Sequence, residues 1–149
     1  MNELKLHESE ERYRSLFEGN SVVMLLINPH TGNIVDANHA AVSYYGWPRS
    51  KLKKMKITDI NTLSTEEVHA AMNEAASYQK NFFEFRHRMA NGDIRDVNVY
   101  SGNILTNGKE LLYSCIIDVT EANANKKNFS KPKKRQKKPI SPSLFFLQT

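Results

Sequence analysis

The sequence predicts an α+β fold with one hydrophobic core: a five-stranded antiparallel sheet, short helices inserted between its second and third strands, and an N-terminal amphipathic helix. Three observations lead to this prediction. Apolar residues recur at helical spacing near the start, two strand-like runs follow, and three more such runs are joined by Asn-Gly turns. The chain has 149 residues, which is the size of one ordinary domain.

The first predicted element is an amphipathic helix within residues 1–20. Charged side chains separate its apolar positions, which are Leu6, Tyr13, Leu16 and Phe17. Gly19 and Asn20 follow, and both tolerate the left-handed backbone that ends many helices. The helix is therefore expected to stop there and to lead into a strand.

Two strands come next, at residues 22–27 and 34–37, with a turn rich in Asn, Pro and Gly between them. Asn38 suits the N-cap of a short helix that should run to Tyr45 and end at Gly46. Further short helical turns are predicted between this helix and residue 60.

A longer helix of about three turns should begin after Ser64. Ser64 and Glu67 have the spacing of a capping box, in which each side chain bonds the other residue's backbone N–H. One apolar stripe lies behind them and consists of Val68, Ala71, Met72, Ala75 and Ala76.

The remaining three strands are predicted at residues 82–89, 94–100 and 111–119. Asn91-Gly92 and Asn107-Gly108 are tight-hairpin signals between them. The last strand is apolar on both alternating sets of positions, so both faces of the sheet need cover. The inserted helices can cover one face, and the first helix or a second subunit is available for the other.

The composition excludes several classes of protein. The longest aliphatic run, residues 22–27, is far shorter than the roughly 20 residues of a membrane-spanning helix. The start of the chain has neither a basic leader nor an apolar stretch, and the single cysteine, Cys115, cannot form an internal disulfide. We therefore expect a cytoplasmic protein without membrane association.

The positive charge is concentrated at the C-terminus. Residues 126–149 contain eight of the 21 Lys and Arg residues and none of the 16 acids, which leaves a net charge of −3 on residues 1–125. Residues 122–149 are predicted to be a disordered basic tail, because they are rich in Asn, Lys and Pro. Nucleic-acid binding is not expected, except through the tail cations Lys131, Lys133, Lys134, Arg135, Lys137 and Lys138. An equal alternative is a chain truncated or read out of frame after Glu121.

Four short segments, in this order and spacing, resemble the PAS domain family of sensory modules. They are residues 38–41, 45–52, 83–92 and 118–121. The resemblance covers roughly residues 9–121 and places the PAS domain itself at residues 21–121. The sequence departs from the family pattern at Lys51, where an acid is usual, and at Lys53-Lys54, where a glycine often ends the helix.

The resemblance implies a sheet that cups a small cavity and a role in signal transduction. Family members sense haem, flavin or small metabolites, or mediate dimerisation, and relay a conformational signal to a kinase or nucleotide cyclase. The family's Asp-x-Thr end anchors the linker to the output domain, and that role falls on Asp118 and Thr120. A homodimer or a signalling effector is the expected partner. The alternatives are a structural dimerisation domain without ligand and a regulator that binds nucleic acid through its tail.

The side chains expected to face the cavity are Ile60, Met72, Phe85, Val97, Tyr113 and Cys115. Strand parity alone does not establish which face of the sheet looks inward. His69 is the candidate haem ligand, since haem-binding members of the family use a histidine on the corresponding helix. Light-sensing members use a cysteine in a helical Asn-Cys-Arg motif, whereas Cys115 lies mid-strand and is expected to be structural. Neither haem nor flavin is favoured, so the cofactor remains unknown.

No catalytic function is expected. The sequence contains no nucleophile elbow, phosphate-binding glycine loop or metal-binding motif, and its histidines are scattered. A thiol hydrolase would need His87 to approach Cys115 across neighbouring strands, and nothing else in the sequence supports one.

Two further clusters have a structural interpretation that is favoured over a binding one. The cations Arg86, Arg88 and Arg95 suggest an anion site or, preferably, a solvated sheet edge. The aromatic residues Tyr44, Tyr45 and Trp47 suggest a stacking platform for a planar ligand or, preferably, core and rim packing.

Overall fold

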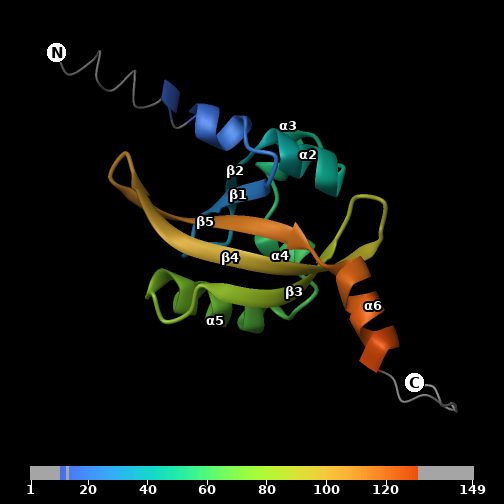
Figure 1. Cartoon of the computed structure of the whole chain (residues 1–149). Helices are drawn as coiled ribbons and strands as arrows, with labels where there is room; N and C mark the ends of the chain where they lie inside the picture. Colours follow the sequence, from blue (N-terminus) through green and yellow to red (C-terminus); the bar gives the residue numbers. More distant parts are fainter. Residues whose placement is uncertain (1–10, 13, 131–149) are drawn as a thin grey trace, which may run out of the picture. The chain divides into compact units, whose positions relative to one another are not determined.

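The computed structural model describes residues 11, 12 and 14–130. Its five strands form one antiparallel sheet in the order β2-β1-β5-β4-β3 (Figure 1). The strands are β1 (Val23–Ile27), β2 (Ile34–Ala37), β3 (Phe82–Arg88), β4 (Ile94–Thr106) and β5 (Lys109–Asp118). The predicted α+β class and five-stranded sheet are confirmed.

The β4–β5 hairpin is longer than the sequence pattern indicates. The prediction ended the fourth strand at Tyr100, but β4 continues to Thr106, which pairs with Lys109. Asn107 and Gly108 make this continuation possible because both adopt positive φ angles, 51° and 75°. Such a turn matches the right-handed twist of the strands on either side.

Four helices lie between β2 and β3, and the ends of α2 and the start of α5 follow the predicted caps. They are α2 (His39–Tyr45), α3 (Arg49–Leu52), α4 (Ile57–Ile60) and α5 (Thr65–Ala76). Asn38 caps α2 by accepting a 3.0 Å hydrogen bond from the backbone N–H of Ala41, and Ser64 and Glu67 form the capping box of α5. Gly46 ends α2 in the left-handed conformation, with φ 94°.

The helices and the inner face of the sheet share one hydrophobic core. Leu25 and Ile27 of β1, Val97 and Val99 of β4, and Leu112 of β5 are buried there with side chains from all four helices. Alternate residues of each strand therefore face the helices, as the two-residue period of a strand requires. Figure 1 shows α5 running along this side of the sheet.

The opposite, outer face carries a smaller cluster that includes the end of the N-terminal helix. Phe17 is buried against Leu26 and Leu111, and residues 14–18 are helical. Of the two covers that the sequence allows for this face, the first helix or a second subunit, the first helix contributes Phe17. Leu16, also predicted as an apolar position of this helix, is 67% exposed. Leu6 and Tyr13 lie outside the described residues.

The segment after β5 differs from the prediction. Residues Thr120–Ser130 form helix α6, a unit separate from the sheet domain, although disorder was expected from residue 122. The run contains neither Pro nor Gly, which would weaken a helix. The negative charge of Glu121, in the first turn, also interacts favourably with the positive end of the helix dipole. The tail cations from Lys131 onward lie outside the described residues, so their binding to nucleic acid stays a prediction. No helix within the described ranges is both long and apolar enough to cross a membrane.

Candidate functional site

A small cavity lies between α5 and the inner face of the sheet. Its volume is about 40 Å³, counted as the space open to the centre of a water molecule. Because one water needs about 10–15 Å³ on this measure, the cavity has room for about three waters or a small organic molecule. Most of its walls are apolar.

One wall is a row of three rings on β3. Phe83, Phe85 and His87 are alternate residues of this strand, so they point to the same face. The ring centroids of Phe83 and Phe85 are 5.3 Å apart, and those of Phe85 and His87 are 6.2 Å apart, with nearly parallel planes. Val68, Ala71, Met72 and Ala75 of α5 form another wall. All of these residues line the cavity.

His87 is the polar residue of this row, and it is only 2% exposed. Its Nδ1 lies 2.8 Å from the hydroxyl oxygen of the buried Tyr45, and its Nε2 has no hydrogen-bond partner within the described part of the chain. Burial lowers the pKa of His87 to about 3, so the ring is neutral at physiological pH.

Two serine side chains supply a second polar point of the cavity. Ser101 and Ser114 face each other across β4 and β5, and their hydroxyl oxygens are 2.9 Å apart. Both are buried and line the cavity. By strand register, Ser101 lies six residues further along β4 than Arg95, the residue opposite His87. The serine pair and His87 therefore belong to different ends of the cavity.

The structure separates the predicted cavity residues into three groups. Met72 and Phe85 line the cavity. Ile60 and Val97 are buried in the surrounding core without lining it. Tyr113 and Cys115 were predicted to face inward, but they lie on the outer face, where Cys115 pairs with Met24 and Tyr100.

The error at Tyr113 and Cys115 has a physical cause. Both alternating sets of positions in β5 are apolar, so the pattern does not distinguish the two faces. The positions that line the cavity are Leu112, Ser114 and Ile116. Cys115 and His87 consequently face opposite sides of the sheet and cannot form a catalytic pair. Burial also raises the pKa of the Cys115 thiol, which disfavours the reactive thiolate.

His69 does not line the cavity. Its neighbours Val68 and Met72 do, and consecutive residues of a helix are about 100° apart around its axis, which turns His69 to the side. Its predicted role as a haem ligand is therefore corrected. Among residues 11, 12 and 14–130, no three His, Cys, Asp or Glu side chains come together as a metal site requires.

The anion site, the less favoured of the two alternatives that the sequence suggests, is not assembled. Arg86 pairs with Asp96 at 3.2 Å, and Arg95 pairs with Asp118 at 2.8 Å. Each of these two cations is matched by a carboxylate, and Arg86 and Arg88 belong to β3, an edge strand of the sheet. The favoured interpretation as a charged sheet edge fits this arrangement.

The aromatic cluster packs rather than forming an open platform. Tyr45 is buried, its ring meets Tyr44 edge-on at 5.0 Å between centroids, and it stacks on Trp47 at 6.5 Å. Tyr44 and Trp47 are partly buried against the main core. No open aromatic face of Tyr45 is left for a planar ligand.

The end of β5 carries a second candidate site. Oδ2 of Asp118 accepts a 2.6 Å hydrogen bond from the Tyr44 hydroxyl and a 2.8 Å hydrogen bond from Nε of Arg95. Burial and the neighbouring Asp118 carboxylate raise the pKa of Tyr44, which keeps its hydroxyl protonated as a donor. Asp118 thus joins α2, β4 and β5 directly before the chain enters α6 at Thr120.

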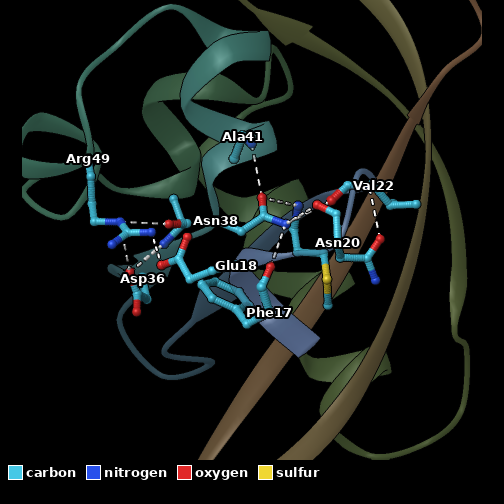
Figure 2. A network of polar contacts seen from close by, with 10 residues as sticks. Phe17, Glu18, Asn20, Val22, Asp36, Asn38, Ala41 and Arg49 are labelled. Atoms are coloured by element: carbon cyan, nitrogen blue, oxygen red, sulfur yellow. Dashed lines mark hydrogen bonds and ion pairs between the residues drawn. The ribbon is translucent and has the colours of Figure 1, made fainter. Parts of the chain in front are cut away.

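Asn38 connects the N-terminal helix to the sheet domain, and sequence reasoning assigned it only the cap of α2. Its Oδ1 accepts from the backbone N–H groups of Met24 and Ala41, both at 3.0 Å. Its Nδ2 donates to the carbonyl oxygens of Phe17, at 3.0 Å, and Val22, at 2.9 Å (Figure 2).

A charged group lies beside this network. Figure 2 shows Arg49 of α3 paired with Glu18, at the end of the N-terminal helix, and close to Asp36. Nε of Arg49 also donates to the carbonyl oxygen of Ala37 at 3.0 Å. The exit of the N-terminal helix is therefore fixed to both β2 and α3.

Comparison with known proteins identifies one matching family model and similar curated proteins. Residues 11–79 match the family model described as PAS domain. The chain is 35% identical over 112 residues to Diguanylate cyclase DgcM of Escherichia coli K12 and 29% identical over 109 residues to Sporulation kinase E of Bacillus subtilis. Each alignment takes in 73% of this chain, but only 27% of the cyclase and 15% of the kinase.

Solved structures show the same fold. The PAS domain of an HTR-like protein from Haloarcula marismortui has a TM-score of 0.68 at 19% identity, over 78% of this chain and 97% of that one. A PAS domain from Desulfitobacterium hafniense has a TM-score of 0.64 at 20% identity, over 68% of this chain and 95% of that one.

Proposed function

We propose that this chain, which belongs to the PAS domain family, is a sensory module in signal transduction that binds a small ligand in the cavity under α5 and relays its presence through β5. The proposal rests on the geometry of β5. Ser114 and Ile116 line the cavity, and Asp118, the next residue on the same side of the strand, bonds to Tyr44 and Arg95. One strand thus connects the cavity to the point where the chain leaves the domain.

The proposed relay works by shifting a conformational equilibrium. A ligand changes the populations of two conformations only to the extent that it binds one more tightly than the other. A molecule that pushes Ser114 and Ile116 outward would strain the contacts of Asp118, so the bound and empty cavities favour different arrangements at the end of β5. Asp118 and Thr120 are the residues we assign to this relay.

We propose a kinase or cyclase as the effector. The support comes from the two curated relatives, which are named as a diguanylate cyclase and a sporulation kinase and are several times longer than the matched region. We propose binding rather than catalysis for the domain itself, because His87 and Cys115 face opposite sides of the sheet.

The experiment compares hydrogen exchange in the full chain with and without 2-butanone, a probe small enough for the cavity. Binding should change exchange not only in the cavity walls but also at residues 117–119 and in α6. Ala71→Leu fills the cavity and should abolish the response. Ala70→Leu is the matched control, since Ala70 is the exposed neighbour on α5 and does not line the cavity. A response that stops at the cavity walls would refute the relay.

A second candidate function, a dimerisation domain without ligand, is favoured by one observation. The outer face of the sheet exposes several apolar side chains, among them Tyr100 at 47% and Ile117 at 46%. Sedimentation equilibrium tests this function: Ile117→Asp should dissociate a dimer that uses this face. Leu105→Asp, near the tip of the β4–β5 hairpin, is a control that changes an even more exposed apolar residue away from the face centre. A wild-type protein that stays monomeric would exclude this function.

A further inference from the structure

The imidazole of His87 has one nitrogen satisfied and one free. Nδ1 is bonded to Tyr45, whereas Nε2 is buried without a partner in the described part of the chain. Leaving a buried polar group unpaired costs about 1–3 kcal/mol. Since His87 lines the cavity, a bound molecule is the available partner for Nε2.

Tyr45 determines which hydrogen-bonding role Nε2 plays. A phenol is a better donor than a neutral imidazole, so the Tyr45 hydroxyl donates to Nδ1 and leaves the ring proton on Nε2. Tyr45 keeps its hydroxyl proton because burial raises its pKa. In this tautomer His87 presents an N–H donor to the cavity, and the matching ligand atom is a hydrogen-bond acceptor.

The rest of the cavity restricts the ligand further. The residues of the sheet domain that line it include no Asp, Glu, Lys or Arg, so nothing there would balance the charge of an ion. Next to His87 the wall consists of the Phe85 and Phe83 rings and of Asn61, whose Oδ1 accepts from the backbone N–H of Leu63, while the serine pair lies at the other end. The ligand therefore needs one acceptor at the His87 end and an apolar body beside it.

We infer that the cavity binds a small uncharged molecule of about three to five non-hydrogen atoms that carries a carbonyl or similar acceptor, which receives a hydrogen bond from Nε2–H of His87. This inference rests on the proposed sensory function and names the chemical class of its ligand. Tyr45 acts as a positioning residue, because it fixes the tautomer of His87 without touching the ligand.

The first measurement needs no ligand. Two-bond ¹H–¹⁵N spectra of the full chain, with ¹⁵N-labelled histidine, identify the tautomer of each ring, and His87→Phe assigns the His87 signals by their loss. We expect the Nε2–H form in the wild type. A ring protonated at Nδ1 would overturn the inference.

The second measurement compares 2-butanone with 2-methyl-1-butene, in which a CH₂ group replaces the carbonyl oxygen. His87→Phe removes the donor and keeps an aromatic ring. It should weaken ketone binding about five- to tenfold and change alkene binding by less than about twofold. His69→Phe is the matched control, because His69 lies on α5 and does not line the cavity, and it should leave the ketone affinity within about twofold.

Tyr45→Phe provides an independent test that does not alter His87. Without the donating hydroxyl, the Nε2–H form should lose population, and ketone affinity should fall while alkene affinity stays the same. Equal losses for ketone and alkene, or ketone binding that neither variant weakens, would overturn the inference. So would the absence of any ketone binding to the wild type.

The outcomes separate this inference from the proposed relay. Ketone binding through His87 with unchanged hydrogen exchange at residues 117–119 would refute the relay and support the ligand class. Equal binding of both probes with altered exchange at those residues would support the relay and refute the ligand class.

Discussion

The Tyr44 hydroxyl donates a 2.6 Å hydrogen bond to Oδ2 of Asp118, which links α2 to the last residue of β5 across 74 positions of sequence. The same oxygen accepts from Arg95. Two donors on one carboxylate oxygen hold the end of β5 in a defined position. The two bonds differ in environment, because Tyr44 is partly buried in the core whereas Arg95 lies at the surface.

This difference predicts unequal effects of removing the two donors. Tyr44→Phe should lower the free energy of unfolding by about 1–2 kcal/mol, since a hydrogen bond to a charged group in a partly buried site is lost. Arg95→Gln should lower it by less than Tyr44→Phe does, because water screens ion pairs at the surface. Urea denaturation measures both, with Tyr100→Phe as an exposed control. A larger effect for Arg95→Gln would contradict this ranking.

A second prediction concerns Gly102 and Tyr113, which face each other across β4 and β5 on the outer face. A Cβ atom at Gly102 would lie 2.7 Å from the Tyr113 hydroxyl oxygen, so the ring of Tyr113 occupies the space above the glycine. Gly102→Ala should therefore be neutral or destabilising by up to about 1 kcal/mol in the wild type. In a Tyr113→Ala background it should stabilise by about 0.5–1 kcal/mol, because alanine suits a strand better than glycine.

The four variants of this pair form a double-mutant cycle, with unfolding free energies from urea denaturation. We expect a coupling energy of at least about 0.5 kcal/mol. Additive effects would mean that the ring does not rest on Gly102.

A third prediction follows from the lowered pKa of His87, about 3 in the folded protein against an ordinary value of 6.5. Between these two values the unfolded chain binds a proton that the folded protein does not, so stability falls as pH decreases. The full contribution is present above pH 6.5 and is lost progressively toward pH 3. The slope from His87 approaches about 1.4 kcal/mol per pH unit below pH 6.

The control for this pH dependence is His87→Phe, which cannot take up the proton. Its unfolding free energy should be nearly flat between pH 6.5 and 5, a range above the ordinary pKa values of carboxyl groups. Equal slopes for the wild type and the variant would show that His87 does not stay neutral in the folded protein.

A fourth prediction concerns Asn38, whose side chain makes hydrogen bonds to the N-terminal helix, β1 and α2 (Figure 2). Asn38→Ala should lower the free energy of unfolding by about 2–4 kcal/mol, because several buried backbone groups lose their partner. Asn38→Ser should cost about 0.5–2 kcal/mol less than Asn38→Ala, since serine still caps α2.

Hydrogen exchange provides the local control for the Asn38 variants. The Gly19 amide, which bonds to the carbonyl oxygen of Ser15 at the end of the N-terminal helix, should exchange faster in both variants. A cost below about 0.5 kcal/mol for Asn38→Ala would show that the network does not hold the domain together.

The features that the sequence predicts well are local ones. Asn38 and Ser64 cap helices through bonds to residues three positions ahead, and the Asn107-Gly108 turn needs only the backbone freedom of its own residues. Alternation along β3 would also have placed His87 beside Phe83 and Phe85. The predicted cavity residues include Phe85 but not His87, which lies on the same face of β3.

Taken alone, the sequence determined the element order up to β5, the caps of α2 and α5, the turns and the family, since each is encoded in neighbouring residues or in their spacing. Only the tertiary structure decided which face of β5 looks inward, because both of its faces are apolar and the choice depends on pairing with β1 and β4 and on the packing of α5. The same packing brings Tyr45 to His87 and Tyr44 to Asp118. Such contacts join residues far apart in the chain, and their energy arises only when the whole sheet has formed.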